Sequence, residues 1–262
     1  MDFSTPYVFD TGQDILGWVR VYEETHNAIY LDAAINAGDW LSSIQQPDGW
    51  FPTTAYSKST HTYHSRVAWA LLRLSEVSQR SIYRDMAILN LNWVVSKQQD
   101  NGWFDISAND EITHFIAYTG RGLLEASVLL GTDDYLQSAR RLADVLLEIQ
   151  LDSGRLYGRY DFRWHPTVEW HCVTGDLQIA IIWLRLYHMT GNEDYHRGAK
   201  SAIEHVTKIQ NIESSEKGIR GGIPGSDPLG GDYCPRQYLS WGTKFYIDAV
   251  HLMLDYCFVL MG

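Results

Sequence analysis

The segment Gln45-Gln46-Pro47-Asp48-Gly49-Trp50-Phe51 has a second copy, Gln98-Gln99-Asp100-Asn101-Gly102-Trp103-Phe104, 53 positions later, and this repeat predicts the fold. The same offset relates Trp40 to Trp93. Each copy is followed by a polar loop and then by a run that contains histidine and turns apolar. Periods of this size are typical of stacked helical hairpins.

Four tyrosines each precede a glutamine by 15 or 16 residues, which predicts second helices of nearly constant length. The pairs are Tyr30 with Gln46, Tyr83 with Gln99, Tyr135 with Gln150, and Tyr195 with Gln210. Apolar residues at helical spacing complete the pattern. They predict first helices over about 9–24, 63–77, 116–130 and 172–189, second helices over about 29–45, 82–98, 133–149 and 193–209, and a ninth helix over about 239–260.

This pattern predicts an all-α protein, an α/α toroid (barrel) of repeated helical hairpins that forms one domain over residues 1–262. The links from a first to a second helix are tight, whereas the links to the next first helix are long, at about 46–62, 99–115, 150–171 and 210–238. We expect the long loops to rim a funnel beside the starts of the inner helices. Nine helices fit a short or incomplete ring, or a chain that lacks an N-terminal hairpin.

Composition excludes several classes of function. The net charge of −11 argues against a nucleic-acid partner, and no run approaches the ~20 apolar residues that a membrane span needs. Cys172, Cys234 and Cys257 are odd in number and widely spaced, which is typical of reduced thiols in a cytoplasmic protein. The sequence has no CxxC, HExxH or GxGxxG pattern, so we expect no metal and no cofactor.

A small residue lies near the start of each predicted inner helix, where it would let crowded helices approach closely. These residues are Gly12, Ser65, Gly120, Gly175 and Gly242. Threonine precedes three of them and is expected to cap the helix, at Thr11, Thr119 and Thr174.

Polar side chains gather around these small residues and predict a ligand cavity. The candidate catalytic residues are Tyr63, His64, Asp10, Tyr118, Glu169 and Asp176. The candidate substrate-binding residues are Arg66, His114, Arg121, His171, Trp50, Trp103, Trp241 and Lys244. The abundant tryptophan and tyrosine fit either core filling or sugar stacking.

Two kinds of chemistry fit these residues. Paired carboxyls suit hydrolysis of a glycosidic bond, and the candidates are Asp10, Asp14, Glu169 and Asp176. Tyrosine and histidine beside arginine suit removal of the proton α to a uronate carboxylate, because the guanidinium neutralises that carboxylate. The second chemistry gives a lyase or an epimerase.

The Gln-x-x-Gly-Trp copies at 46–50 and 99–103 resemble the repeats of terpene-cyclase and prenyltransferase toroids. The chain from about 8 to 255 resembles bacterial prenyltransferase-like or polysaccharide-biosynthesis proteins. The matching stretches are Phe9–Gln13, His61–Trp69, Ile116–Thr119, Ile181–Tyr187 and Gly218–Ile223. The resemblance implies a terpene-cyclase-like and six-hairpin-glycosidase-like toroid linked to surface polysaccharides, and it carries over no catalytic residue. The DxDD motif of terpene cyclases is missing from this sequence.

The leading hypothesis is a carbohydrate-active enzyme. It would bind a polysaccharide or oligosaccharide in the funnel and cleave or modify it at an acidic sugar, as a lyase, an epimerase or a glycoside hydrolase. Two alternatives stay open. One is a non-catalytic glycan-binding or polysaccharide-assembly protein, and the other is an isoprenoid enzyme of the terpene-cyclase or prenyltransferase kind, which would need an apolar funnel.

Overall fold

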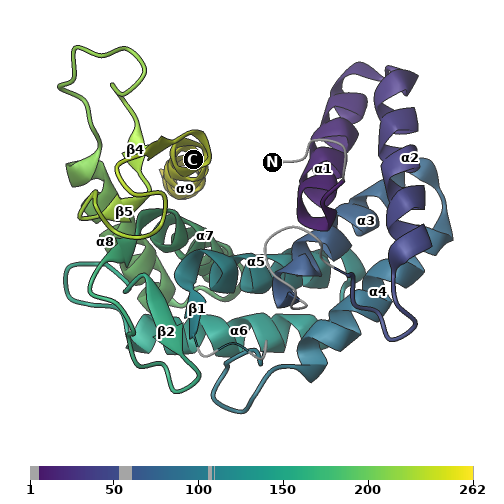
Figure 1. Cartoon of the computed structure of the whole chain (residues 1–262), viewed down its shortest axis with the longest axis horizontal. Coiled ribbons are helices and arrows are strands. Elements are labelled where there is room, and N and C mark those ends of the chain that lie inside the picture. Colours follow the sequence, from purple (N-terminus) through teal and green to yellow (C-terminus); the bar gives the residue numbers. More distant parts are fainter. Residues whose placement is uncertain (1–5, 53–60, 106–107, 109, 262) are drawn as a thin grey trace. The chain divides into compact units, whose positions relative to one another are not determined.

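The chain folds into helical hairpins (Figure 1). A computed structural model describes residues 6–52, 61–105, 108 and 110–261, with the backbone alone for 255–261. Within these ranges there are nine α-helices and six short strands. The predicted all-α class is therefore confirmed, and the short strands are an addition that the helical periodicity did not predict.

The helices alternate between two sets, as expected. The first-set helices are α1 (Val8–Thr25), α3 (Ser65–Ser78), α5 (Thr113–Leu130), α7 (Val173–Thr190) and α9 (Ser240–Met261). The second-set helices are α2 (Ala28–Ile44), α4 (Ser81–Ser96), α6 (Asp133–Glu148) and α8 (Glu193–Ile209). The main difference from the expected bounds is α5, which begins three residues early and so includes His114.

The helices belong to two compact units. Unit 1 comprises Met1–Ser107 and Tyr118–Ala139, and unit 2 comprises Ala108–Ala117 and Arg140–Gly262. Helices α5 and α6 therefore contribute to both units. The single domain expected from the repeat stays a prediction.

In unit 1, α1 packs on α2 and α3, and α3 packs on α4. Glycine permits the close contacts between first-set helices. A Cβ added to Gly12 would lie 2.9 Å from Cγ2 of Val67, and one added to Gly122 would lie 2.4 Å from the carbonyl carbon of Ser65. In α5 it is thus Gly122 that makes a close approach to α3.

Unit 2 repeats this packing around α7, which contacts α8 and α9. A Cβ on Gly175 would lie 2.9 Å from Cγ2 of Thr113, and one on Gly242 would lie 3.2 Å from Cγ2 of Thr174. The starts of α5, α7 and α9 are therefore drawn together.

Short antiparallel strand pairs fix the long loops of unit 2. The pairs are β1 (Asp110–Ile112) with β2 (Arg159–Asp161), β3 (His171–Cys172) with β5 (Ser226–Asp227), and β4 (Ile223–Pro224) with β6 (Tyr238–Leu239). In the second pair His171 lies opposite Asp227. Residues far apart in the sequence thereby come together beside the starts of α5 and α7.

The repeated glutamine holds the second-set helices together, and the structure corrects which glutamine does so. The side-chain amide donates to a glycine carbonyl in its own loop and to a carbonyl of the next second-set helix. The pairs to the next helix are Gln45 with Met86, Gln98 with Ser138, and Gln150 with Gly198, each at 2.9 Å. The equivalent residues are therefore Gln45 and Gln98, not Gln46 and Gln99, and each follows its tyrosine by 15 positions.

The expected threonine caps are wrong. Thr11, Thr119 and Thr174 all lie inside their helices, after the first turn has begun. Their hydroxyls have other uses. Thr119 Oγ1 hydrogen-bonds Thr62 Oγ1 at 3.1 Å, and Thr174 Oγ1 hydrogen-bonds His114 Nδ1 at 3.1 Å. Helices α1, α3 and α7 begin without a side-chain cap. Asparagines of the tight turns cap two second-set helices, α2 and α8, as where Asn192 accepts from the amide of Asp194 at 3.0 Å.

The hydropathy of the helices and the state of the cysteines were also predicted from the sequence. In the part of the chain that the structure describes, every helix is too short or too polar to cross a membrane. The thiols of Cys172 and Cys234 are free, and the side chain of Cys257 lies outside the described residues.

Candidate functional site

The predicted site residues fall into two groups, one in each unit. The first group, in unit 1, surrounds Tyr63 at the end of the loop that precedes α3. Its ring stacks on that of His61, with centroids 4.3 Å apart, and meets the edges of Phe9 and Tyr118 at 5.3 and 6.3 Å. His64 lies against Tyr63 at 5.2 Å. The structure thus brings together Tyr63, His64 and Tyr118, as the sequence predicted.

The two histidines of the first group are buried and neutral. Burial lowers the pKa of His61 to about 4. It lowers the pKa of His64 to about 3, with a further contribution from His61. Neither imidazole carries a proton on both nitrogens at neutral pH, because an unpaired charge is costly where water is excluded.

The arginines of the first group are held by neutral and acidic neighbours. Arg66 donates to Oε1 of Gln13 at 2.8 and 3.2 Å, and its guanidinium lies 4.8 Å from the ring centre of Tyr118. Arg121 donates to Glu125 at 2.7 Å. An ion pair this sheltered reduces the ability of Arg121 to neutralise a sugar carboxylate.

Three more predicted residues lie in unit 1. Asp10 is half-buried in the first turn of α1. The pKa of Asp14 is raised chiefly by the burial of its own carboxyl and secondly by the negative charge of Asp10. Trp50 is half-buried, whereas Trp103 is buried with 3% of its surface exposed. Trp103 therefore offers little ring surface for a sugar to stack on.

The second group, in unit 2, contains Asp176 in the first turn of α7. This side chain is 1% exposed. Its Oδ1 accepts from the amide of Leu156 at 3.0 Å, and its Oδ2 is buried without a hydrogen-bond partner among the described residues. Burial raises the pKa of Asp176 well above its ordinary value, because a carboxylate taken out of water loses its hydration.

Beside Asp176 lies an ion-pair cluster that the sequence did not reveal. Oδ2 of Asp227 accepts from Arg155 at 3.3 Å and from Nε2 of His205 at 3.0 Å. His171, opposite Asp227 in the strand pair, has its Nδ1 3.0 Å from the carbonyl oxygen of Leu156. Burial lowers the pKa of His171 and of His205.

Glu111, also missed by sequence reasoning, lies in β1 of unit 2. Its Oε1 accepts from the amide of Ile112 at 2.8 Å. Burial raises the pKa of Glu111 to about 7, although that hydrogen bond and Arg159 both oppose the rise. A carboxyl with a pKa near 7 is suited to general acid–base catalysis.

His114 completes the second group at the start of α5. Nδ1 of its ring lies 2.7 Å from Nε2 of Gln178 and 3.1 Å from Oγ1 of Thr174. The ring also packs against Tyr233, with centroids 5.0 Å apart. Gln178 was not predicted, because a glutamine on a helix gives no signal in the sequence.

The remaining predicted residues of unit 2 are accessible to solvent. Trp241 is 42% exposed and its indole N–H donates to the hydroxyl of Tyr233 at 3.0 Å. Lys244 is exposed and paired with Asp248, and Glu169 is exposed in the loop before β3. Glu169 thus has none of the burial that shifts Asp176. In the described part of the chain, no three His, Cys, Asp or Glu side chains converge as metal ligands.

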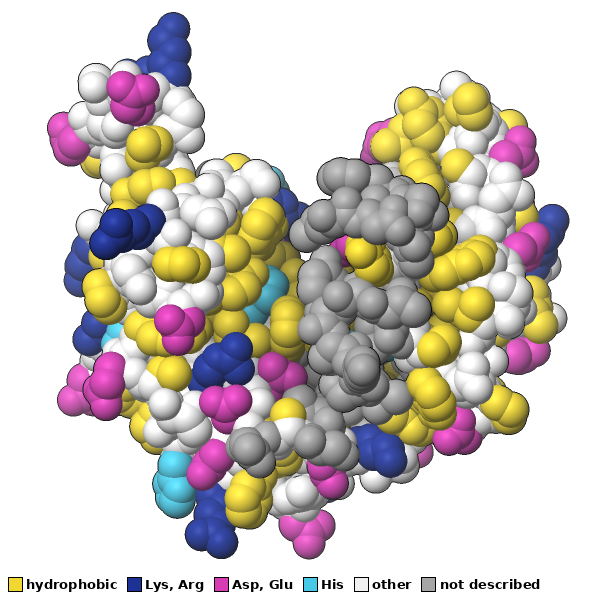
Figure 2. Space-filling view, in the orientation of Figure 1, with side chains coloured by type: hydrophobic (Ala, Val, Ile, Leu, Met, Phe, Trp, Pro, Cys, Tyr) yellow, Lys and Arg dark blue, Asp and Glu magenta, His cyan; other side chains and the backbone are white. Residues whose placement is uncertain are grey.

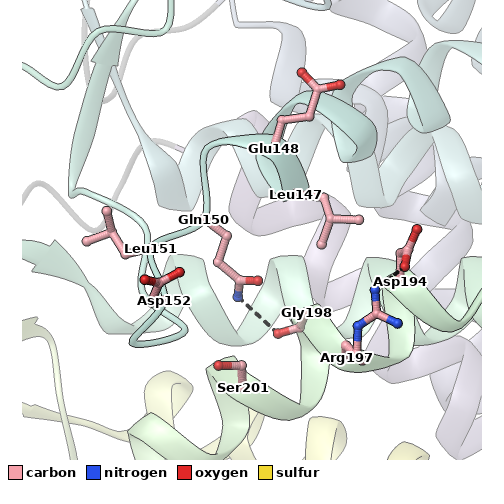
Figure 3. A pocket seen from close by; sticks show the side chains of 9 residues that line it. All are labelled: Leu147, Glu148, Gln150, Leu151, Asp152, Asp194, Arg197, Gly198 and Ser201. Carbon is pink, nitrogen blue, oxygen red and sulfur yellow. Dashed lines mark hydrogen bonds and ion pairs between the residues drawn. The ribbon is translucent and has the colours of Figure 1, made fainter.

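An open depression of about 420 Å³ lies elsewhere in unit 2, on α6 and α8. Figure 3 shows Gln150 bound to Gly198 at its centre and Arg197 paired with Asp194 at its edge. None of its lining residues belongs to either group. Since it lacks a buried polar side chain of the kind seen at Asp176, we place the candidate site at the starts of the first-set helices.

On the face seen in Figure 2, Lys and Arg side chains are interspersed with Asp and Glu. This mixed surface accompanies the net charge of −11.

Comparison with known proteins places the fold. No family model and no curated protein matches the chain. Among solved structures, D-mannose isomerase superposes with a TM-score of 0.77 at 15% identity, over 95% of this chain and 71% of that one. Unsaturated glucuronyl hydrolase from Bacillus sp. GL1 superposes with a TM-score of 0.75 at 17% identity, over 93% of this chain and 73% of that one. Cellobiose 2-epimerase from Bacillus thermoamylovorans B4167 superposes with a TM-score of 0.74 at 13% identity, over 94% of this chain and 71% of that one.

These structures support the six-hairpin-glycosidase-like part of the resemblance and do not support the terpene-cyclase-like part. The polar and charged groups at the helix starts also differ from the apolar lining that an isoprenoid enzyme would need. The chain therefore has the α/α-toroid fold of repeated helical hairpins, shared with enzymes named for sugar substrates.

Proposed function

We propose that this protein is a glycan-active enzyme in which Asp176 donates a proton to the substrate. One observation carries the proposal. Asp176 is a buried carboxyl with a raised pKa whose Oδ1 is held by the amide of Leu156, while its Oδ2 has no partner among the described residues. A buried carboxyl oxygen without a hydrogen bond costs about 1–3 kcal/mol. A carboxyl whose pKa is raised by burial is suited to act as a general acid.

The chemistry that suits a carboxyl with a raised pKa is acid-assisted cleavage. Asp176 would give its proton to the leaving oxygen as the glycosidic C–O bond breaks. A second carboxylate would take a proton from the water that adds to the sugar carbon. Glu111 is our candidate for this second role, because its pKa of about 7 leaves it partly ionised under neutral conditions.

The substrate class follows from three lines of support. Structures with the same fold are named for mannose, cellobiose and unsaturated glucuronyl substrates. Arg155 and Arg159 lie half-exposed in unit 2, where they pair with Asp227 and Asp110, and an acidic sugar would exchange its carboxylate for one of these. Trp241 offers an exposed indole for stacking on a sugar ring. We therefore propose an oligosaccharide that contains an acidic sugar.

A second candidate function is favoured by the first group. His61 and His64 are neutral and so can accept a proton, and Tyr63 lies between them and Phe9. Removal of a proton next to a uronate carboxylate would make the protein a lyase or an epimerase. The low pKa values of both histidines make them weak bases, which is why we rank this reaction second.

A glycan panel tests the proposal. Neutral and uronate-containing oligosaccharides are incubated with the protein, and reducing ends, unsaturated-uronate absorbance and exchange of sugar protons in D₂O are measured. Hydrolysis should raise reducing ends without a new unsaturated product. Asp176→Asn keeps the acceptor for Leu156 and should lower turnover by roughly 10²–10⁴-fold, whereas the control Asp152→Asn, in the outer depression, should not.

Other outcomes are equally decisive. A folded Asp176→Asn variant with unchanged turnover would refute the role of Asp176. Product exchange in D₂O that is lost in Tyr63→Phe and His64→Ala would establish the second candidate. Binding without turnover would leave the non-catalytic alternative. Fractionation of cells tests the cytoplasmic location, which we propose because the described cysteines are free thiols.

A further inference from the structure

The carboxyls of Asp176 and Asp227 are held in contrasting ways. Asp227 has 23% of its side chain exposed, and its Oδ2 takes two partners, Arg155 at 3.3 Å and Nε2 of His205 at 3.0 Å. Asp176 is 1% exposed, and its Oδ2 has no partner among the described residues. Since a buried charge needs a counter-ion more than an exposed one does, the arginine lies with the carboxyl that needs it less.

A strand pair brings the two carboxyls to the same end of α7. Strand β3 runs directly into α7, which carries Asp176 in its first turn. The pairing of β3 with β5 places Asp227 opposite His171. Asp227 therefore lies close enough to Asp176 for the two charges to interact.

Arg155 reaches the same place from the loop before β2. It precedes Leu156, whose amide donates to Oδ1 of Asp176 at 3.0 Å. Gly154 packs this loop on α8, because an added Cβ would lie 2.3 Å from the main-chain oxygen of Ser201. His205 follows Ser201 by one turn of α8, which explains why it meets the same carboxylate as Arg155.

The charges of Arg155 and Asp227 act on Asp176 in opposite directions. Burial is the main cause of the raised pKa of Asp176, the positive charge of Arg155 opposes the rise, and the negative charge of Asp227 adds to it. While Arg155 and Asp227 are paired, their charges largely cancel at Asp176. Loss of Asp227 alone would leave the guanidinium uncompensated beside a buried carboxyl.

Other titratable groups on the elements around Asp176 are uncharged or paired elsewhere. Burial raises the pKa of the Tyr160 phenol in β2 and that of the Cys172 thiol in β3, so both keep their protons. Lys244 of α9 pairs with Asp248.

The nearby histidines also have partners other than Asp176. His171 lies against the carbonyl oxygen of Leu156, His114 of α5 against Gln178, and His205 against Asp227. Burial lowers the pKa of His171 and of His205. Among the described neighbours of Asp176, Arg155 is thus the permanent cation.

We propose that Asp227 is a positioning residue that binds Arg155 and His205, withholds their positive charge from Asp176, and so lets the buried carboxyl hold its proton more tightly. The use of that proton in catalysis rests on the proposed function, whereas the capture of charge by Asp227 does not. In this role Asp227 transfers no proton itself.

Carbon NMR tests the inference without any substrate. In protein labelled with ¹³C at the aspartate carboxyls, the signal of Asp176 is assigned by its loss in Asp176→Asn and followed with pH. Asp227→Asn should lower the titration midpoint of Asp176 by about 1–3 pH units, because Arg155 is released. The double variant Arg155→Gln/Asp227→Asn lacks both charges and should return the midpoint towards the wild-type value. An unchanged midpoint in Asp227→Asn, or no recovery in the double variant, would overturn the inference.

Arg155→Gln decides the matter if Asp227→Asn does not fold. It removes the cation and leaves the negative charge of Asp227, so the midpoint of Asp176 should rise, and a fall would overturn the inference. Asp110→Asn is the matched control, because Asp110 pairs with Arg159 at 3.4 Å and has a similarly exposed side chain. It should leave the midpoint of Asp176 unchanged, and a decrease as large as that of Asp227→Asn would show that no specific pairing is involved.

The pH dependence of kcat provides the kinetic readout on an oligosaccharide that the glycan panel shows to be cleaved. The limb on which kcat falls with rising pH should move to lower pH in Asp227→Asn and return in the double variant. An equal loss of kcat at every pH would show a structural role only and would overturn the positioning role. Failure of the proposed function would instead appear as unchanged turnover in Asp176→Asn, while the NMR titration would still decide the role of Asp227, so the two failures are distinguishable.

Discussion

Gln98, after α4, is bound to Ser138 of α6 through two hydrogen bonds. Its amide nitrogen donates to the main-chain oxygen at 2.9 Å, and its amide oxygen accepts from the hydroxyl at 2.8 Å. Gln45 and Gln150 make the corresponding main-chain contact to α4 and α8. One side chain per hairpin therefore joins neighbouring second-set helices.

Gln98→Ala should lower the free energy of unfolding by about 1–3 kcal/mol, because it removes both hydrogen bonds and leaves the buried hydroxyl of Ser138 without this acceptor. The exposed neighbour Gln99 is the matched control, and Gln99→Ala should change stability by no more than about 0.5 kcal/mol. Urea denaturation of both variants measures the difference. Equal losses would mean that the glutamine contact contributes nothing specific.

Gly49→Ala should be far more destabilising than Gly191→Ala, although both glycines have positive φ, at 101° and 70°. At Gly49 an added Cβ would lie 2.3 Å from the main-chain oxygen of Leu89, whereas at Gly191 it would meet no atom within 4 Å. We expect a loss of about 1–2 kcal/mol at Gly191 from backbone strain alone, and roughly 3 kcal/mol or more at Gly49. Thermal and urea unfolding of both variants would measure this difference in stability, and equal losses of stability would contradict the prediction.

The buried histidines should make the protein sensitive to acid. In the unfolded chain His61 and His64 take up protons near pH 6.5, but the folded protein resists protonation until about pH 4 and 3. Below pH 6.5 the unfolded state binds more protons, so stability falls by up to about 1.4 kcal/mol per pH unit for each histidine.

His64→Gln should remove one such contribution, so its stability should fall less steeply between pH 6.5 and 4.5 than that of the wild type. The exposed His26 provides the control variant His26→Gln, which should keep the wild-type slope. Parallel curves for wild type and His64→Gln would show that His64 is protonated as easily in the folded protein as in the unfolded chain.

Asp176 and Glu111 should give stability the opposite pH dependence, a decrease as pH rises. Both have a folded-state pKa above the unfolded value, so above about pH 4 the unfolded state loses protons that the folded state retains. Stability then falls as pH rises above about pH 4, and for Glu111 this fall continues to about pH 7. Asp176→Asn and Glu111→Gln should each flatten the decline seen in urea denaturation between pH 5 and 8.

Glu111 also gives a kinetic prediction. If it serves as the second carboxyl, the pH–rate profile should contain a limb near pH 7 that disappears in Glu111→Gln. The exposed Glu169 provides the comparison, and Glu169→Gln should retain that limb. Loss of the limb in Glu169→Gln alone would transfer the role to Glu169.

The sequence predicted the helices well because their signal is local. The apolar periodicity placed α1 to α9 within about three residues, and Gly131 and Gly191 end their helices with positive φ, as turn chemistry requires. The predictions that failed depended on exact register. The equivalent glutamines were displaced by one position, and the threonines expected as caps lie within their helices, because caps and side-chain contacts depend on where each helix starts.

The candidate site was predicted only in part. Tyr63, His64 and Tyr118 meet as expected because they flank neighbouring helix starts within one repeat pattern. Asp227 and His205 come together across 22 positions, and Gln178 reaches His114 across 64. No periodicity encodes such pairs, because they depend on how loops and strand pairs fold back onto the helices.

The order of residues specifies the repeat: the hairpins, the small residues at helix crossings, and the polar residues placed at each inner-helix start. The chemistry of those polar residues depends on how the chain packs. Asp10, Glu169 and Asp176 are the same kind of carboxyl in the sequence, yet Asp10 is half-buried, Glu169 is exposed and Asp176 is 1% exposed. Burial raises the pKa of Asp176 well above its ordinary value. Burial and hydrogen bonding, which no residue carries on its own, set the proton affinity that makes a side chain an acid, a base or a donor.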